Sequence, residues 1–266
     1  MRVSLDLNGL SSPITMTLHE EEDQVSREII ENGIWEAYET TIVTRRLMPG
    51  DVFVDVGANI GYYTLLASSL VGKNGRVVAF EPELKNFDLL RKNALEHPLA
   101  NMRVFNLGLS NEEGNAMLYL SPQNLGDHRI FNDEDRTGQN VKLVPGDQLL
   151  MAECERIDFI KIDTQGAEAH VIEGMQETIR ANRDHLDMII EFWPYGLQQA
   201  GRSARELLSL LEPFQFDIFV IHHVDHQILP TDCAELLDAA ENSNLLPRDK
   251  GFINLFLTAK GAANLL

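Results

Sequence analysis

The sequence predicts an α/β fold with a doubly wound parallel sheet. From position 52 onward, short apolar runs rich in β-branched residues alternate with stretches whose apolar residues recur at spacings of three and four. The predicted strands are 52–57, 76–82, 102–109, 157–163, 186–192, 217–223 and 252–259. The predicted helices are 60–71, 84–97, 167–182 and 203–214. Helices placed between parallel strands cover both faces of a sheet, so a single α/β domain is expected.

The domain organisation follows from where this alternation begins and where it breaks. Residues 51–266 carry the alternation, and residues 1–50 are predicted to cap the same domain, with a hairpin within 11–24 and a helix over 25–47 that ends before Pro49-Gly50. Residues 112–150 interrupt it with a polar centre that contains Asn and Gly. An insertion of this length usually covers a site or is partly mobile.

Composition narrows the classes of partner. The chain has 41 acidic and 22 basic residues and a net charge of −19, which works against binding of nucleic acid or an anionic membrane. Cys154 and Cys233 form no Cys-x-x-Cys pattern, so no disulfide scaffold or zinc cluster is expected. The acidic first thirty residues do not have the pattern of a secretion signal, and no apolar run approaches the ~18 residues of a membrane span. A cytoplasmic protein without membrane contact is therefore expected.

The segment VFVDVGANIGYYT, residues 52–64, joins a strand to a helix through a glycine turn. Such a turn presents backbone N–H groups to a polar or anionic ligand. A dinucleotide site has Gly-x-Gly-x-x-Gly, but the matching positions here are Gly57, Asn59 and Tyr62. The pattern Asp55-x-Gly57-x-Asn59-x-Gly61 places an acid at the strand end and an amide in the loop. It suits a ligand with both an amino acid and a nucleoside, such as S-adenosylmethionine.

Two further strand ends fit an adenosine ligand. Glu81 lies in AFEP, about 20 residues beyond the glycine turn, where a carboxylate accepts hydrogen bonds from both ribose hydroxyls. Dinucleotide and methyl-donor sites share this feature, so it does not choose between them. Ser110 or Asn111 in GLSN would meet the adenine edge or form a simple turn.

Together the segments DVGANIG, AFEP with LLRKN after it, LGLSNEEGN and IDFIKIDTQGAEAHVIEGM resemble the FkbM family of S-adenosylmethionine-dependent methyltransferases, over roughly residues 49–194. The resemblance implies a class I, Rossmann-like methyltransferase fold, with seven strands of which the last is antiparallel. It also implies methyl transfer, mostly to hydroxyl oxygens of sugars, polyketides and related metabolites. The implied roles are Asp55, Gly57, Asn59 and Gly61 on the methionine side, Glu81 at the ribose and Ser110 near the adenine. Many members have an acidic residue where this chain has Gln165.

An aliphatic hydroxyl is a poor nucleophile, so a proton acceptor is expected at the strand ends. Asp163, at the end of the fourth predicted strand, is the first choice to face the methyl group or the acceptor, or it caps the next helix. Glu168 lies in the first turn of that helix, where the helix dipole stabilises a carboxylate with or without a chemical role. His128, in GDHR of the insertion, is a second candidate base, and GDHR recurs in a subset of the family.

A divalent cation is a further expectation at this site. Glu191 ends the fifth predicted strand and would lie across from Asp163 if the two strands are adjacent. Two carboxylates, water and the acceptor oxygens would then hold the ion.

The sequence therefore predicts an S-adenosylmethionine-dependent O-methyltransferase that acts on a small hydroxylated acceptor held under residues 112–150. Two alternatives stay open, a non-catalytic protein that binds S-adenosylmethionine and an NAD-dependent oxidoreductase. A homo-oligomer is also left open.

Overall fold

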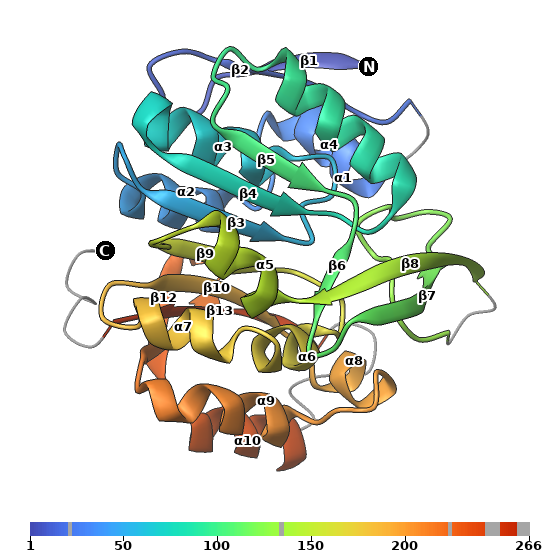
Figure 1. Ribbon diagram of the computed structural model, residues 1–266, viewed down its shortest axis with the longest axis vertical. Coiled ribbons are helices and arrows are strands. Elements are labelled where there is room, and N and C mark those ends of the chain that lie inside the picture. The colour runs from blue at the N-terminus through green and yellow to red at the C-terminus, as the bar shows by residue number, and fades with distance from the viewer. Residues whose placement is uncertain (21–22, 133–135, 223–224, 243–250, 260–266) are drawn as a thin grey trace.

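The computed structural model describes residues 1–20, 23–132, 136–222, 225–242 and 251–259. Within these residues the main sheet has eight strands in the order β12-β11-β13-β10-β9-β3-β4-β5 (Figure 1). Its strands are β3 Val52–Val56, β4 Arg76–Phe80, β5 Met102–Phe105, β9 Phe159–Ile162, β10 Asp187–Phe192, β11 Asp217–His222, β12 Gln227–Thr231 and β13 Ile253–Thr258. Each of the seven predicted segments contains one of these strands, and β12 is an additional edge strand. Position 223 lies outside the described residues.

The strand directions give a mostly parallel sheet. β5, β4, β3, β9 and β10 are parallel neighbours, whereas β13 pairs antiparallel with both β10 and β11. The antiparallel last strand implied by the family resemblance is therefore present, with β12 pairing antiparallel to β11 beyond it.

Two apolar clusters cover the two faces of this sheet. Neighbouring residues of one strand join different clusters, with Val54 on one face and Phe53 on the other, as the period of two requires. The face of Val54 packs against α6 Glu168–Glu173, α7 Gln176–Asn182 and α9 Ala204–Leu211. The face of Phe53 packs against α1 Gln24–Asn32, α2 Ala37–Arg46 and α3 Tyr62–Val71. The remaining helices are α4 Leu84–Glu96, α5 Gly146–Glu153, α8 Pro194–Gln199, α10 Cys233–Asn242, η1 Gly72–Asn74 and η2 Glu212–Phe214.

Two predicted helices are each divided in the structure. The helix expected over 25–47 is α1 and α2, because Gly33 ends α1 in a left-handed conformation and Glu36 precedes α2 with a φ of 42°. The helix expected over 167–182 is α6 and α7, divided at Gly174. A Cβ at Gly174 would overlap the carbonyl oxygen of Ser110 in strand β6 (Gly108–Ser110), so the chain approaches β6 too closely there for a larger residue.

Two small sheets accompany the main one. β1 Arg2–Leu5 pairs antiparallel with β2 Ile14–Thr17. The hairpin was expected within 11–24, but its first strand begins at residue 2, nine residues earlier. β6 Gly108–Ser110, β8 Thr137–Pro145 and β7 Gly114–Leu120 form a three-stranded sheet beside the strand ends of the main sheet, at the right of Figure 1. The expected insertion therefore contains a β-hairpin, whose connection includes residues 133–135 outside the described part.

The hairpin β1–β2 and helices α1 and α2 share the apolar cluster of Phe53. On this basis we propose that residues 1–50 cap the same domain as residues 51–266. In the described residues, no helix is both long and apolar enough to cross a membrane.

Candidate active site

A cavity of about 360 Å³ lies at the carboxyl ends of β3, β4, β9 and β10. β3 and β9 are neighbours, yet the chain continues outward from β3 to β4 on one side and from β9 to β10 on the other. Open α/β sheets bind ligands at such a reversal of strand order. Residues 124–130 of the insertion and residues 35–36 before α2 complete the walls.

The turn after β3 forms one wall of the cavity. Asp55 is buried, and its carboxylate accepts a hydrogen bond from the Thr64 hydroxyl at 2.6 Å, so it holds the first turn of α3. Burial raises the pKa of Asp55 to about 6. Gly57 has a φ of 83°, and a Cβ there would overlap the carbonyl oxygen of Asp163. Glycine is therefore required both by the left-handed turn and by the close approach of the loop after β9.

Asn59 connects this turn to the insertion. Its Oδ1 accepts from the Ile60 N–H at 2.6 Å, and its Nδ2 donates to the Leu125 carbonyl at 3.2 Å. Gly61 begins α3 with a φ of 93° and is not among the described residues that line the cavity. Asn59 thus lies on the cavity side of the turn. Gly61 lies away from the cavity, and its left-handed backbone allows the chain to turn into α3.

Glu81 lies just beyond β4 and lines the cavity. Its Oε2 accepts from the Asn59 N–H and its Oε1 from the Glu83 N–H, both at 2.8 Å. Burial raises the pKa of Glu81 to about 8. Two backbone donors fix the carboxyl group, and each oxygen keeps a second lone pair for a ligand hydroxyl.

Ser110 and Glu168 are not among the described residues that line this cavity. The Ser110 hydroxyl donates to Asn111 Oδ1 at 3.2 Å within β6. Glu168 is fully buried and accepts hydrogen bonds from the Thr164 N–H, the Thr164 hydroxyl and the Gly166 N–H. Burial raises the pKa of Glu168 to about 7. In this position Glu168 holds the 163–168 loop in place, whatever its chemical role.

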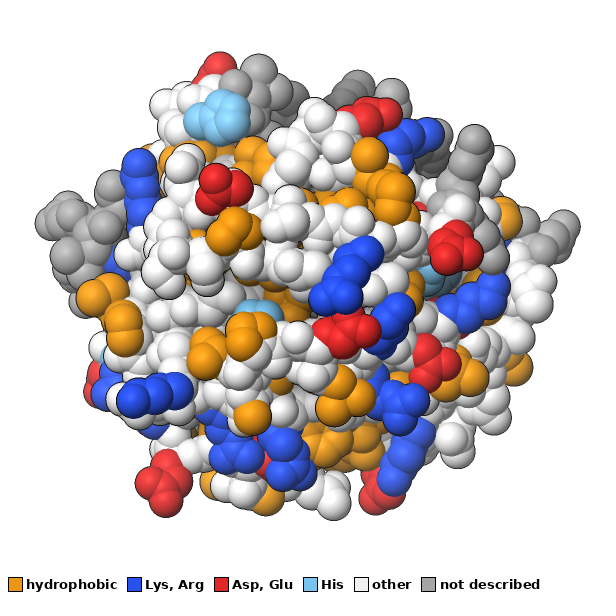
Figure 2. Space-filling view, turned by 90° about the horizontal axis from the view of Figure 1, so that it is seen from above, with side chains coloured by type: hydrophobic (Ala, Val, Ile, Leu, Met, Phe, Trp, Pro, Cys, Tyr) orange, Lys and Arg blue, Asp and Glu red, His pale blue; other side chains and the backbone are white. Residues whose placement is uncertain are grey.

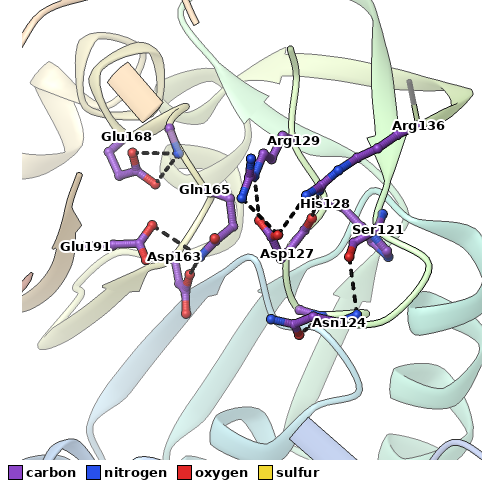
Figure 3. Close-up of polar contacts among 12 residues, drawn as sticks. Ser121, Asn124, Asp127, His128, Arg129, Arg136, Asp163, Gln165, Glu168 and Glu191 are labelled. Atoms are coloured by element: carbon purple, nitrogen blue, oxygen red, sulfur yellow. Dashed lines mark hydrogen bonds and ion pairs between the residues drawn. The ribbon is translucent and has the colours of Figure 1, made fainter. Parts of the chain in front are cut away.

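Asp163 and Glu191 do lie side by side at the ends of β9 and β10, and Gln165 joins them (Figure 3). Gln165 Nε2 is 2.8 Å from Asp163 Oδ1 and 3.1 and 3.2 Å from the two oxygens of Glu191. Burial, with the charge of Asp163 next, raises the pKa of Glu191 well above its usual range. The amide therefore occupies the position between the carboxylates that the expected divalent cation would take. Across the described ranges, no group of three or more His, Cys, Asp or Glu side chains is arranged to hold a metal ion.

Lys161 is a site residue that the sequence analysis did not identify. It lies in the fully buried strand β9, lines the cavity, and its Nζ is 2.9 Å from Asp163 Oδ2 and 3.7 Å from Glu36 Oε2. Burial lowers the pKa of Lys161, but the charges of Asp163 and Glu36 outweigh this and hold the pKa above its ordinary value. A lysine inside an otherwise apolar strand, two residues before an aspartate, was the available signal.

Glu36 is the second residue that sequence reasoning missed. It precedes α2, lines the cavity, and its Oε2 accepts a hydrogen bond from the Tyr63 hydroxyl at 2.9 Å. Burial raises the pKa of Glu36 to about 7. Its neighbour Trp35 also lines the cavity, so the connection between α1 and α2 forms one end of the site.

The insertion covers the cavity with residues 124–130, and His128 is among them. His128 Nδ1 accepts from the Ser121 N–H at 3.1 Å, and burial lowers the pKa of the ring. A neutral imidazole that accepts at Nδ1 carries its proton on Nε2, so this contact makes His128 a hydrogen-bond donor at Nε2.

A group of charged side chains fixes the same segment (Figure 3). Asp127 accepts from Arg129 at 2.6 and 2.9 Å and from the buried Arg136 at 3.0 Å. The Arg129 guanidinium lies 4.7 Å from the ring centroid of Trp193, just beyond β10. These contacts tie the insertion to the far side of the cavity.

Most of the chain matches a known family of methyltransferases. Residues 55–218 match the model of the methyltransferase FkbM domain. A hexuronic acid methyltransferase, AglP, of Haloferax volcanii is 30% identical over 133 residues, 49% of this chain and 52% of that protein. The 31-O-demethyl-FK506 methyltransferase FkbM of Streptomyces tacrolimicus is 47% identical over 76 residues, 29% of this chain and 28% of that protein. The matched part spans about half the length of the first relative and less of the second.

Solved structures of methyltransferases resemble the fold. A methyltransferase FkbM from Methylobacillus flagellatus has a TM-score of 0.46 at 16% identity, over 83% of this chain and 51% of that one. Fibrillarin of Aeropyrum pernix, in complex with S-adenosylmethionine, has a TM-score of 0.45 at 13% identity, over 80% of this chain and 68% of that one.

The order of the main sheet and the antiparallel β13 are those expected of the class I, Rossmann-like methyltransferase fold. The family model covers more than half of the sequence, and the chain belongs to the FkbM methyltransferase family.

Proposed function

We propose that the protein transfers a methyl group from S-adenosylmethionine to a hydroxyl oxygen of a small metabolite. The observation that carries the proposal is one cavity that extends from Glu81 beyond β4 to Asp163 and Glu191 beyond β9 and β10. Its volume of about 360 Å³ lies in the range of small-molecule sites. A donor on the β3–β4 side and an acceptor on the β9–β10 side would meet within it.

The residues on the β3–β4 side fit S-adenosylmethionine. The free lone pairs of the Glu81 carboxyl group suit the two ribose hydroxyls, and Asn59 with the Gly57 turn suits the methionine part. An apolar strip on the small sheet suits the adenine, and its cavity-lining residues are Leu109, Leu118, Val141 and Leu143. Ser110 remains in this proposal as the residue next to that strip, and Asp55 and Gly61 as the residues that hold the turn.

When bound, S-adenosylmethionine supplies an activated methyl group on a sulfonium centre. The contribution of the protein is to hold the acceptor oxygen in line behind this carbon and to take the hydroxyl proton. Because the Gln165 amide already bridges Asp163 and Glu191, we assign the activation of the acceptor to protein side chains instead of a divalent cation. The roles of Asp163 and Glu168 at the chemistry stay predictions.

The names of two relatives support a small acceptor. One is a hexuronic acid methyltransferase and the other a 31-O-demethyl-FK506 methyltransferase. A nucleic acid is a poor candidate for a chain with a net charge of −19. A cytoplasmic location is part of the same proposal, and a homo-oligomer is compatible with it.

The first test is calorimetric titration with S-adenosylmethionine and, separately, with NAD. The wild type should bind S-adenosylmethionine and not NAD. Loss of the hydrogen bonds from the two ribose hydroxyls in Glu81→Ala should weaken binding by about ten- to a hundredfold. Glu112→Ala, which removes an exposed carboxylate in the turn between β6 and β7, is the matched control and should bind as the wild type does.

The outcomes separate the three functional hypotheses. Tight binding of NAD would identify an oxidoreductase and contradict the proposal. Binding of S-adenosylmethionine without turnover of hydroxylated compounds would leave the non-catalytic binding protein. Turnover is measured as formation of S-adenosylhomocysteine with methyl glucoside, methyl glucuronide and cyclohexane-1,2-diol as probes.

A further inference from the structure

Glu36 has an unusual backbone conformation for its position in the fold. It stands at the N-cap of α2 with φ 42° and ψ 67°, in the left-handed region that a residue with a Cβ rarely adopts. An acidic side chain at an N-cap usually accepts a hydrogen bond from the first turn of its own helix. The Glu36 side chain makes no such bond and lines the cavity instead. Backbone strain of this kind is often retained at functional sites.

The contacts of Glu36 involve one of its two carboxyl oxygens. Oε2 accepts from the Tyr63 hydroxyl and lies 3.7 Å from Lys161 Nζ. Oε1 has no hydrogen-bond partner in the described part of the chain, and the side chain keeps 16% of its surface exposed. The position of the carboxyl group is therefore fixed through one oxygen, while the other stays available for a new hydrogen bond.

The other two carboxyl groups on this side of the cavity are already engaged. Asp163 accepts from Lys161 at one oxygen and from Gln165 at the other. Both oxygens of Glu191 lie within 3.2 Å of the Gln165 amide nitrogen. Of the three groups, Glu36 is the one with an oxygen that accepts no hydrogen bond within the described residues, so it is the best placed to form a new, short hydrogen bond with an acceptor.

We propose that Glu36 is the general base that takes the hydroxyl proton of the acceptor, an inference that rests on the proposed O-methyltransferase function. The acceptor oxygen forms a bond to the methyl carbon, and the carbon–sulfur bond breaks with its electron pair on sulfur. The hydroxyl proton moves to Glu36 Oε1, and water later removes it from the carboxyl group. Tyr63 and Lys161 are positioning residues, because they hold Oε2.

The electrostatic environment fits this role. Burial raises the pKa of Glu36 to about 7, Lys161 opposes this rise, and Glu39 and Asp163 add to it. A base is most effective when its pKa is near the operating pH. The other group that faces Glu36 is the Tyr63 hydroxyl, whose pKa burial raises well above its usual range, so Tyr63 stays a neutral donor.

The first arm of the test compares Glu36→Gln with Glu39→Gln. Glu39 is a fully buried carboxyl group one turn along α2 that does not line the cavity, so the second variant makes the same chemical change outside the site. With the three hydroxyl probes, Glu36→Gln should lower kcat by about 10²- to 10⁴-fold. In the wild type we expect kcat/KM to fall below about pH 7, and Glu36→Gln should abolish this fall. Glu39→Gln should keep kcat close to that of the wild type and keep the fall of kcat/KM on the acid side, at a somewhat lower pH, because the charge of Glu39 no longer raises the pKa of Glu36.

Calorimetry with S-adenosylmethionine separates failure of this inference from failure of the proposed function. Both variants should bind it within about threefold of the wild type, since neither side chain is assigned to the donor. A Glu36→Gln variant that binds normally and methylates a probe at the wild-type rate would overturn the role of Glu36 while leaving the methyltransferase intact. A Glu36→Gln variant whose kcat/KM still falls below about pH 7, along the acid limb of the pH profile, would also overturn the role of Glu36.

The second arm needs no acceptor and decides the case if the wild type methylates none of the probes. The protein with S-adenosylhomocysteine is treated with a water-soluble carbodiimide and glycine ethyl ester at neutral pH, and peptide mass spectrometry maps the modified carboxyl groups. A protonatable carboxyl group open to the cavity predicts modification of Glu36 ahead of Asp163. Modification of Asp163 with Glu36 untouched would assign the open carboxyl group to Asp163 and reject the inference.

Discussion

His128 accepts a hydrogen bond from the Ser121 N–H at Nδ1, and burial lowers the pKa of its ring. In the neutral ring the proton then lies on Nε2, so we expect the side chain to act as a hydrogen-bond donor and not as the base. The sequence suggested His128 as a base because its ordinary pKa lies near neutrality. The contact from the Ser121 N–H that decides the tautomer depends on how residues 121–128 fold, and no pattern in the sequence predicts that fold.

A prediction at the residue scale follows from this tautomer. His128→Ala should lower kcat/KM by no more than about tenfold, the effect of losing one neutral hydrogen bond. The acid limb of the pH profile should stay where it is in the wild type, because another group takes the proton. Steady-state kinetics across pH, with whichever probe the enzyme methylates, give kcat/KM and the pH at which it falls. A loss above about 10²-fold together with a displaced acid limb would restore His128 as the base.

At the scale of elements, hydrogen bonds to the backbone of Leu125 connect the insertion to the rest of the site. Its carbonyl accepts from Asn59 Nδ2 at 3.2 Å and from Asn86 Nδ2 at 2.8 Å, and its N–H donates to Asp23 Oδ1 at 3.0 Å. Three side chains from the β3 turn, α4 and the start of α1 thus hold the backbone N–H and C=O of one residue of the insertion at the cavity. We expect this segment to act as a lid that becomes more ordered when ligand binds.

The prediction for this element concerns hydrogen exchange. Backbone amides of 121–131 should exchange more slowly with S-adenosylhomocysteine bound than without it. Asn86→Ala removes one donor to Leu125 and should weaken ligand binding by about fivefold, equivalent to about 1 kcal/mol. Asn115→Ala, an exposed asparagine of β7, is the matched control and should behave as the wild type. Equal protection of 121–131 with and without ligand would exclude a lid.

The elements also show what could be predicted from the sequence. The main-sheet strands found from apolar runs are all present, since burial on both faces leaves a clear signal in segments such as VFVDV. The helix breaks at Glu36 and Gly174 were missed, because the periodicity of apolar residues continues across them. Gly174 avoids a clash with Ser110, a contact between positions that are far apart in the chain.

The sequence likewise predicted some residues of the candidate site and missed others. Glu81 and Asp163 were placed at strand ends by their position after apolar runs, and both line the cavity. Lys161 was hidden inside such a run. Glu36 was hidden because its approach to Lys161 depends on how the segment before α2 packs over β9. Long-range charge pairs of this kind leave no local pattern in one sequence.

At the scale of the whole molecule, the net charge of −19 has both a surface part and a buried part. In Figure 2, Lys and Arg side chains on the displayed face stand in small groups among acidic side chains, with no continuous basic surface there. Beneath the surface, five carboxyl groups at or next to the cavity have pKa values raised by burial, namely Glu36, Asp55, Glu81, Glu168 and Glu191. Some of the acidic residues of the chain therefore lie buried near the cavity, where burial makes ionisation of their carboxyl groups unfavourable.

This buried acidity predicts how stability depends on pH. A carboxyl group whose pKa is raised in the folded state binds more protons folded than unfolded, so its stabilising contribution is fully present below the unfolded pKa. That contribution is lost as pH rises through the folded pKa, here from about 6 for Asp55 to about 8 for Glu81. The melting temperature of the ligand-free protein should therefore fall between about pH 5.5 and about pH 8.5, by about 2–4 °C for each kcal/mol of stability lost.

Thermal unfolding at constant ionic strength measures this dependence in the wild type and in Glu81→Gln. The amide of the variant does not ionise, so its melting temperature should fall less over the same range and exceed that of the wild type at the alkaline end. Glu112→Gln, an exposed site, should reproduce the wild-type slope. A wild-type melting temperature that rises with pH would mean that the carboxyl groups around the cavity are stabilised as anions. The protonated state inferred for Glu81 in the ligand-free protein would then be wrong, and its ribose-binding role would begin from a carboxylate.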